Sequence, residues 1–247
     1  MTITQPTLLS FTPLQKTNTS PHHPQLANSS PYQKLIGQSA WNRLHPAIQN
    51  RFTYPVSTTG DNLFCKNETV IYKGVMNKVQ MSLMGKILAY CCRLIGTPLA
   101  LYEGENIPTT VKVYPDKNRG GMTWDRRYHF PNKPTNQVVS TKSINQNGLS
   151  ELVGFGFGMK LDVNEYKGAI VFESTKFFVK IGKLKLTIPD WLTPGKTTVQ
   201  QRAINNEEFE FTLRVTHKFF GQMFYQIGRF KNINQSTNLP KRLENAL

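Results

Sequence analysis

The segment at residues 154–163, GFGFGMKLDV, constrains the fold more than any other part of the chain. Read with a period of two, it places apolar side chains on one side and three glycines, Lys160 and Asp162 on the other. Such alternation predicts a strand with one buried face, and glycine in a strand is typical of a sharp bend or a close backbone approach. We therefore predict a curved strand in a strongly coiled antiparallel sheet. A dinucleotide-binding loop is disfavoured, because Met159 stands where the third glycine would be needed.

Alternation of the same period continues through most of the chain after residue 107. The strands expected before the loop at 189–196 cover residues 109–115, 120–130, 138–145, 150–163 and 169–188, and two closing strands follow, of which 208–219 alternates most regularly. Within 169–188 the apolar side changes at Gly182, as it does at a bulge or a turn. The pattern predicts an antiparallel sheet of six or more strands.

Two segments with helical spacing precede the strands. Residues 32–52 carry apolar side chains at steps of three and four, with Pro46 dividing them into shorter pieces. Residues 81–95 are apolar nearly all round, so this helix is expected to be buried or to lie against a membrane. Together these patterns predict an α+β fold: a strongly curved antiparallel sheet or partial barrel, lipocalin- or START-like in general shape, with two N-terminal helical segments.

The chain is expected to contain a single domain. Residues 1–31 are rich in Pro, Ser, Thr and Asn and cannot bury enough apolar surface to offset the entropy of ordering, so we expect a disordered leader. Residues 32–231 form the β-rich domain, and residues 232–247 a polar tail. No secretory signal pattern or membrane-spanning run occurs. Three cysteines without a disulfide framework suggest a reducing compartment, so we predict a cytoplasmic protein, with a membrane-peripheral position as the alternative.

The chain is strongly basic, with a net charge of +15 and a pI near 9.8. Its densest basic segment holds four lysines in a strand-like stretch: Lys176, Lys180, Lys183 and Lys185. An anionic partner, nucleic acid or lipid, and a merely solvated face both explain such a segment. Nucleic acid is the weaker candidate, because no Arg-rich run, helix-turn-helix spacing or zinc-knuckle pattern accompanies the charge.

Three ionisable residues interrupt apolar columns of the expected strands. Arg126 shares a side with Trp124, His217 continues the column of Phe211, and Glu173 lies among valines and phenylalanines. Unpaired burial would cost several kcal/mol for each group, on the order of the usual desolvation penalty, so each needs a partner, a water or a ligand. One interpretation is a site for the head group of an amphipathic ligand, whose tail lies among apolar residues: Phe155, Phe157 and Phe211. The other is a structural salt bridge, or strand ends that face solvent.

Catalysis and metal binding are not indicated by any motif. No serine or cysteine sits in a nucleophile elbow, no carboxylate pair is recognisable, and the five histidines lack metal-ligand spacing. We therefore expect no catalytic residues, no metal and no cofactor.

Several motifs together resemble a bacterial family known as domain of unknown function 4166. They are W-x-R-L-H-P-A-x-x-x-R-F from Trp41, G-V-M from Gly74, the pair Trp124 and Arg126, G-L-x-E-x-x-G-F-G from Gly148, G-K-L-x-L-x-I-P ending at Pro189, and H-x-x-F-G-x-M-F-Y-x-x-G-x-F from His217. The resemblance covers about residues 32–230. It implies a stand-alone member of a family whose relatives are fused to saccharopine-dehydrogenase-like NAD(P)-binding domains or lie beside a membrane segment. It supplies no catalytic residues, but it directs attention to Glu151 and Tyr225.

Three functional hypotheses follow. The first is non-catalytic binding of a hydrophobic or amphipathic small molecule in a β-rich cavity, as an accessory to a reductase-like protein or a membrane partner. The second is an enzyme, or enzyme subunit, acting on such a ligand. The third is an anionic-surface binder that uses the basic face. The first predicts an apolar cavity that Arg126 or His217 reaches.

Overall fold

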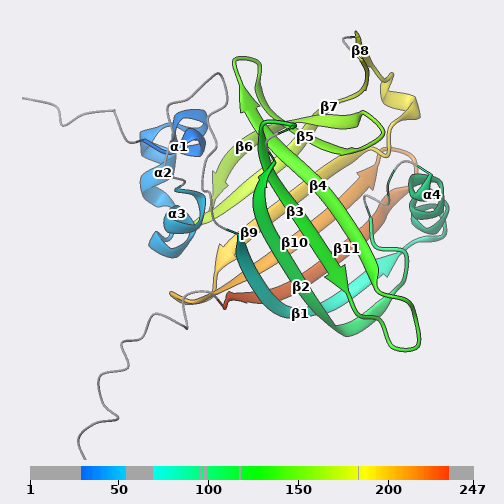
Figure 1. Ribbon diagram of the computed structural model, residues 1–247, viewed down its shortest axis with the longest axis horizontal. Helices are drawn as coiled ribbons and strands as arrows, with labels where there is room; N and C mark the ends of the chain where they lie inside the picture. The colour runs from blue at the N-terminus through cyan, green and yellow to red at the C-terminus, as the bar shows by residue number, and fades with distance from the viewer. Residues whose placement is uncertain are drawn as a thin grey trace, which may run out of the picture.

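We analysed a computed structural model of the chain, which describes residues 29–53 and 69–233 apart from 95, 97, 98, 117 and 183 (Figure 1). Most of the expected leader and tail, together with Cys65 and Lys183, lies outside the described residues. The helices are α1 (Pro31–Ile36), α2 (Gln38–Arg43), α3 (Pro46–Phe52), α4 (Leu83–Arg93) and the 3-10 helix η2 (Asp190–Leu192). The strands are β1 (Val70–Met81), β2 (Gly104–Asp116), β3 (Gly121–Tyr128), β4 (Asn136–Asn145), β5 (Gly148–Gly154), β6 (Phe157–Tyr166), β7 (Ala169–Ile181), β8 (Leu184–Thr187), β9 (Lys196–Ala203), β10 (Glu208–His217) and β11 (Gly221–Asn232).

The strands form one antiparallel sheet that closes into a barrel. Its order is β6-β5-β4-β3-β2-β1-β11-β10-β9-β7-β8, and β6 also pairs with β7, so ten strands complete the circle and β8 extends from β7 outside it. Closure satisfies the backbone groups of what would otherwise be two sheet edges. The predicted curved sheet or partial barrel is confirmed, and the barrel is closed.

The barrel core comes from the alternation that the sequence displays. In β10, Phe209, Phe211, Val215 and His217 are buried at odd positions, while the even positions are partly or fully exposed. In β4 the inward positions are even and include Val138, Ser140, Lys142 and Ile144. Every strand of the barrel thus supplies one column of side chains to the interior.

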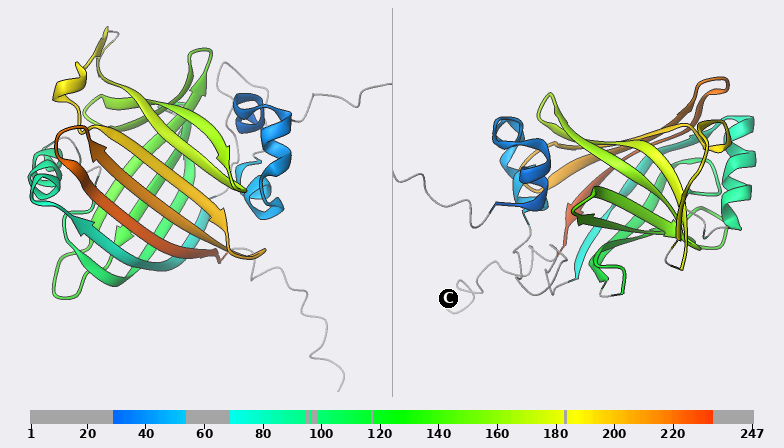
Figure 2. Two further views of the ribbon diagram at one scale, coloured as in Figure 1. Left: turned by 180° about the vertical axis from the view of Figure 1, so that it is seen from behind. Right: turned by 90° about the horizontal axis from the view of Figure 1, so that it is seen from above.

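Three short helices lie beside one end of the barrel (Figures 1 and 2). The first begins with a capping box, in which the Ser30 hydroxyl accepts from the N–H of Tyr32 while Gln33 accepts from the N–H of Ser30. Tyr32 and Phe52 pack edge to face at 5.1 Å, and both contact the ring of Phe172 in β7. Aromatic packing therefore holds these helices on the barrel wall.

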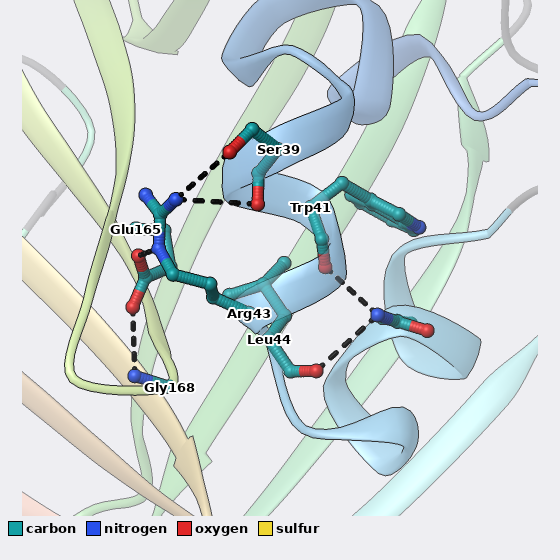
Figure 3. Close-up of polar contacts among 7 residues, drawn as sticks. Ser39, Trp41, Arg43, Leu44, Glu165 and Gly168 are labelled. Carbon is teal, nitrogen blue, oxygen red and sulfur yellow. Dashed lines mark hydrogen bonds and ion pairs between the residues drawn. The ribbon is translucent and has the colours of Figure 1, made fainter.

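An ion pair fastens the helices to the turn between β6 and β7 (Figure 3). Nε of Arg43 lies 2.6 Å from Oε2 of Glu165, whose other oxygen accepts from the N–H of Gly168 at 2.8 Å. The hydrogen bond from Gly168, and then the one from Arg43, hold the pKa of Glu165 below its ordinary value. Gln49 donates to the carbonyls of Trp41 and Leu44, which joins α3 to α2.

The opposite end carries α4, η2 and the turns β5–β6, β7–β8 and β10–β11 (Figure 2). The contact of α4 with β11 depends on Gly85, because a Cβ at this position would lie 1.8 Å from the carbonyl oxygen of Met223. The N–H of Ser82 donates to the same oxygen at 3.0 Å, and the Ser82 hydroxyl accepts from the N–H of Gly85. Both interactions fix the first turn of α4 against the start of β11.

Several sequence expectations need correction. Residues 154–163 are not one strand: Phe155 and Gly156 form the β5–β6 turn with positive φ angles of 46° and 81°, and β6 begins at Phe157. Three strands rather than two follow the loop at 189–196, because Lys196–Ala203 is also a strand. The helix expected at 81–95 extends over Leu83–Arg93 and is not buried all round, since Leu83, Ile87 and Tyr90 are exposed on its outer side.

No helix among the residues that the structure describes has the length and apolar character that crossing a bilayer requires.

We predict that Gly85→Ala destabilises the protein by about 1–3 kcal/mol, the usual cost of overpacking. The same change in a helix interior normally stabilises by up to about 1 kcal/mol, so the predicted sign is the reverse of helix propensity. Urea denaturation followed by circular dichroism measures the effect. Cys91→Ala, at an exposed position of α4, is the control and should change stability by less than about 0.5 kcal/mol. A stabilised Gly85→Ala protein would contradict the described contact between α4 and β11.

Candidate functional site

A cavity of about 560 Å³ occupies the barrel interior at the end that carries α4 and η2. Its walls are predominantly apolar, and they come from elements far apart in the sequence. The main apolar lining residues are Met84, Ile87, Leu88, Leu99, Val153, Phe157, Met159, Phe177, Ile188, Trp191, Leu192, Val199, Leu213, Val215, Phe220 and Met223. A concave, apolar space of this size is typical of small-molecule sites.

A gap in the barrel wall contributes to the mouth of this cavity. β7 pairs with β9 only from Ile170 to Glu173, and nearer the mouth β7 pairs with β8 instead. The chain between β8 and β9, which includes η2, crosses the region where the two strands separate and supplies Trp191 and Leu192 to the lining. Access to the interior therefore lies beside a short, non-strand segment rather than between two paired strands.

The inner end of the cavity is polar and charged. Arg126 of β3, Ser140 of β4 and Glu151 of β5 line it, and they lie on three consecutive strands. Nη2 of Arg126 donates to the Ser140 hydroxyl at 3.1 Å and lies 3.7 Å from Oε1 of Glu151. Nζ of Lys142, directly opposite Glu151 across β4 and β5, lies 3.0 Å from the same oxygen. We refer to Arg126, Ser140, Lys142 and Glu151 as the charged floor.

The charged floor is almost free of solvent. The side chains of Lys142 and Glu151 each have 6% of their surface exposed, and that of Arg126 has 11%. Nζ of Lys142 also lies 4.7 Å from the ring centroid of Trp124 and 5.8 Å from that of Phe172. Aromatic faces and one carboxylate thus replace the water around this ammonium group.

The electrostatics of the floor favour a negatively charged guest. Burial alone would raise the pKa of Glu151, but the charges of Lys142 and Arg126 outweigh it and hold that pKa below its ordinary value. Burial lowers the pKa of Lys142, Glu151 opposes this effect, and repulsion from Arg126 adds to it. Two cationic side chains therefore share one ionised carboxylate, which leaves positive charge uncompensated within the floor when both are protonated.

A third basic side chain approaches the floor from the end of the barrel that carries α1, α2 and α3, which we call the helical end. The guanidinium of Arg51 lies between the rings of Tyr72 and Phe209, at 3.8 Å and 3.7 Å from their centroids, and its Nε donates to Gln201. A small cavity of about 20 Å³ separates it from Arg126 and Lys142. This volume suits a single water molecule, so little space remains between Arg51 and the floor.

His217 lies at the other extreme of the cavity, near the mouth. Its Nδ1 accepts from the N–H of Phe219 at 3.2 Å, and its ring stacks on Phe220 at 4.8 Å. Across the described residues, no ionisable side chain makes a hydrogen bond or ion pair with it. Its environment is that of a packed histidine rather than of an acid–base pair.

The structure places the predicted ligand-binding residues in three different locations. Arg126, Glu151, Phe157 and His217 line the large cavity. Trp124 and Phe211 lie deeper, in the packed core around the small cavity. The remaining three lie outside both cavities: Glu173 pairs with Lys196 at 2.9 Å, Tyr225 lies under the guanidinium of Arg214, and Phe155 is 77% exposed in the β5–β6 turn.

Sequence reasoning missed Lys142 and Ser140, although the signal that identified Arg126 was present. Lys142 shares the even-numbered side of its strand with Val138 and Ile144, so it also interrupts an apolar column. The lining contributed by η2 has no such signal, because a short 3-10 helix between strands shows no period.

The described lysines of the predicted basic face lie on β7 and β8. Lys180 and Lys185 are directly opposite each other across β7 and β8, while Lys176 is opposite Lys160 across β7 and β6. Burial, and then the nearby charges of Lys160 and Lys180, lower the pKa of Lys185. Lys183 lies outside the described residues.

The thiols at the cavity mouth differ in their surroundings. Burial, and to a lesser degree Cys91, raises the pKa of Cys92 to about 11, so Cys92 stays a protonated thiol at neutral pH.

Among the residues described, no three His, Cys, Asp or Glu side chains are grouped closely enough to hold a metal ion. The arrangement is suited to holding a molecule by burial and charge.

We predict that Glu151→Gln destabilises the protein by about 3–5 kcal/mol, because it leaves two buried cations without a carboxylate. The folded-state pKa of Glu151 is lowered, so its contribution is present above about pH 5 and is lost as the pH falls through the folded value. The stability difference between wild type and Glu151→Gln, measured by urea denaturation, should therefore be constant near neutrality and shrink in acid.

The matched control is Glu173→Gln, which removes the partly exposed pair with Lys196. It should cost no more than about 1 kcal/mol, as surface pairs do. Equal losses for the two variants would show that the charged floor is not desolvated as described.

Comparison with known proteins gives a match to a family model. No curated protein and no solved structure matches it. A family model described as a domain of unknown function, DUF4166, matches residues 44–230, which include all eleven strands except the last two residues of β11. Because this match covers well over half of the chain, the protein belongs to the DUF4166 family.

Proposed function

We propose that this protein binds an amphipathic small molecule in the barrel cavity without changing it chemically. The observation that carries the proposal is the contrast within one cavity: apolar walls over most of its depth, and a desolvated charged floor at its inner end, where two basic side chains share one carboxylate. A ligand that matches both parts has an apolar body and a polar group that is anionic or a strong hydrogen-bond acceptor.

The polar group of the ligand is expected to lie against Arg126. The contacts of this side chain with Ser140 and Glu151 both use Nη2, so its other nitrogens can donate to a ligand. Lys142, in contrast, is directly opposite Glu151 and is enclosed by aromatic rings. Arg126 is therefore the side chain of the floor best placed to recognise an anion, and a planar guanidinium suits carboxylate or phosphate oxygens.

The apolar body of the ligand is expected to extend toward the mouth. Phe157, Phe177 and Met223 line this part of the cavity, and Met159 and Met84 provide adaptable side chains there. Burial of apolar surface would supply most of the affinity, at roughly 25 cal/mol for each Å² removed from water.

An enzymatic role finds less support in this cavity. His217 is the one histidine that lines it among the described residues, and its contacts are a backbone N–H and aromatic rings. General acid–base chemistry would require a polarising partner within hydrogen-bond reach.

A pair of fluorescent probes tests the proposal. The first is 1-anilinonaphthalene-8-sulfonate, which is anionic, and the second is N-phenyl-1-naphthylamine, which has the same aromatic body without the sulfonate. We predict that Arg126→Gln weakens binding of the anionic probe by about tenfold or more, since a hydrogen bond to a charged group contributes roughly 1.5–3 kcal/mol. Binding of the neutral probe should change little.

The control is Arg127→Gln, one residue further along β3, where the side chain points outward and pairs with Asp125. It should leave both affinities unchanged. Equal effects of Arg126→Gln and Arg127→Gln, or none from either, would refute an anion site at the charged floor.

A further inference from the structure

Large apolar side chains are exposed mainly at the mouth end of the barrel. Of the sixteen exposed large hydrophobic residues in the part of the chain that the structure describes, twelve lie at this end. They are on α4 or directly after it, on η2, on the β7–β8 hairpin, or in the β5–β6 and β10–β11 turns. They are Leu83, Ile87, Tyr90, Leu94, Phe155, Ile181, Leu184, Leu186, Trp191, Leu192, Phe219 and Phe220, which we call the mouth rim. Among the described residues at the helical end, the exposed large hydrophobic side chains are Tyr166 and Ile204, next to turns, and Leu35 on α1. Such clustering marks an interaction surface.

The mouth rim is formed by separate projections that surround an opening. α4 lies on one side, η2 and the β7–β8 hairpin on another, and the β10–β11 turn between them (Figure 2). The exposed fractions are high at the tips, with 69% for Trp191, 81% for Leu94 and 74% for Phe219. A folded protein partner would need a surface complementary to all these tips, whereas a fluid bilayer accommodates any outline.

Positive charge accompanies the apolar tips. Lys180 and Lys185 are directly opposite each other on the β7–β8 hairpin, and Lys218 lies in the β10–β11 turn. Like charges directly opposite on a sheet destabilise it, so this pair costs stability in the isolated protein. The nearby acidic residues are fewer: Glu103 is paired with Lys86 at 2.6 Å, and Asp190 begins η2. The rim therefore carries excess positive charge next to its apolar side chains.

We propose that the mouth rim docks on an anionic lipid bilayer, with the apolar tips among the acyl chains and the lysines against the head groups. Trp and other aromatic residues favour the boundary between head groups and acyl chains, and each lysine near an anionic leaflet contributes roughly a fivefold increase in binding. The cavity mouth then faces the bilayer, because Ile87, Trp191, Leu192 and Phe220 belong both to the rim and to the cavity lining. This surface goes beyond the proposed ligand binding and does not depend on the identity of the ligand.

The intrinsic fluorescence of the protein provides a direct readout. The chain has three tryptophans, and Trp41 and Trp124 are buried while Trp191 is exposed. Vesicles of phosphatidylcholine with phosphatidylglycerol should shift the emission to shorter wavelength and reduce quenching by acrylamide. Vesicles of phosphatidylcholine alone should do so weakly, and high salt should reduce the effect.

Matched variants distinguish vesicle binding through the mouth rim from nonspecific binding to vesicles. Lys180→Gln with Lys185→Gln should lower co-sedimentation with the anionic vesicles by tenfold or more, since two charges are removed. Lys34→Gln with Lys231→Gln, which removes two charges at the helical end, should have little effect. For the apolar part, Leu94→Ala with Phe219→Ala should reduce co-sedimentation, and Tyr166→Ala with Ile204→Ala should not. None of these four residues lines the cavity. Neutral-probe binding in the cavity checks that each variant is folded.

Three outcomes would overturn the proposal. One is a failure of wild type to bind anionic vesicles, and another is an equal response of the rim and helical-end variants. The third is a Lys180- and Lys185-dependent affinity for single-stranded nucleic acid without affinity for vesicles, which would assign the surface to nucleic acid. Because cavity binding is measured separately with the neutral probe, failure of membrane docking and failure of ligand binding are distinguishable.

Discussion

The pairing of β6 with β7 is the constraint on which the rest of the structure depends. It turns an eleven-stranded sheet into a closed ten-stranded barrel, and it gives the inner column of each strand one enclosed space to share. The same β7 then leaves β9 after Glu173 and pairs with β8, so the closed barrel keeps an opening at one end. Closure at the helical end and separation at the other together explain why the cavity is deep and has a mouth.

Within that space, the charged floor divides a packed half from a hollow half. Below it, Trp124, Phe211 and Arg51 fill the barrel, and above it the apolar walls enclose the cavity. Lys142 and Arg126 share Glu151, so two basic side chains are held by one carboxylate at the floor. Removing one partner of such a buried ionic group is costly, but replacing the whole group with apolar residues often leaves stability unchanged or higher. Stability alone therefore does not explain the charged floor, whereas recognition of a ligand would.

Sequence patterns predicted much of the barrel but only part of the site. Strict alternation in β10 and the break at Gly182 were sufficient to predict strands and a turn, because a period of two follows directly from strand geometry. Alternation does not reveal which side of a strand faces solvent. Arg126 and Glu173 both interrupt apolar columns, yet Arg126 points into the barrel and Glu173 forms a partly exposed ion pair. In the sequence pattern, Phe155 continues the apolar column of β6, but its positive φ places it in the β5–β6 turn. The wall contributed by η2 depends on tertiary contacts that no local pattern encodes.

Native mass spectrometry of the purified protein tests whether the cavity above the charged floor holds an amphipathic molecule. We expect a stoichiometric adduct that organic solvent extracts and that has an apolar body with an anionic or strongly hydrogen-bond-accepting group. Arg126→Gln should lose that adduct, while Arg127→Gln should retain it. An adduct without such a polar group, or one kept equally by both variants, would show that the charged floor does not bind the polar group of a ligand.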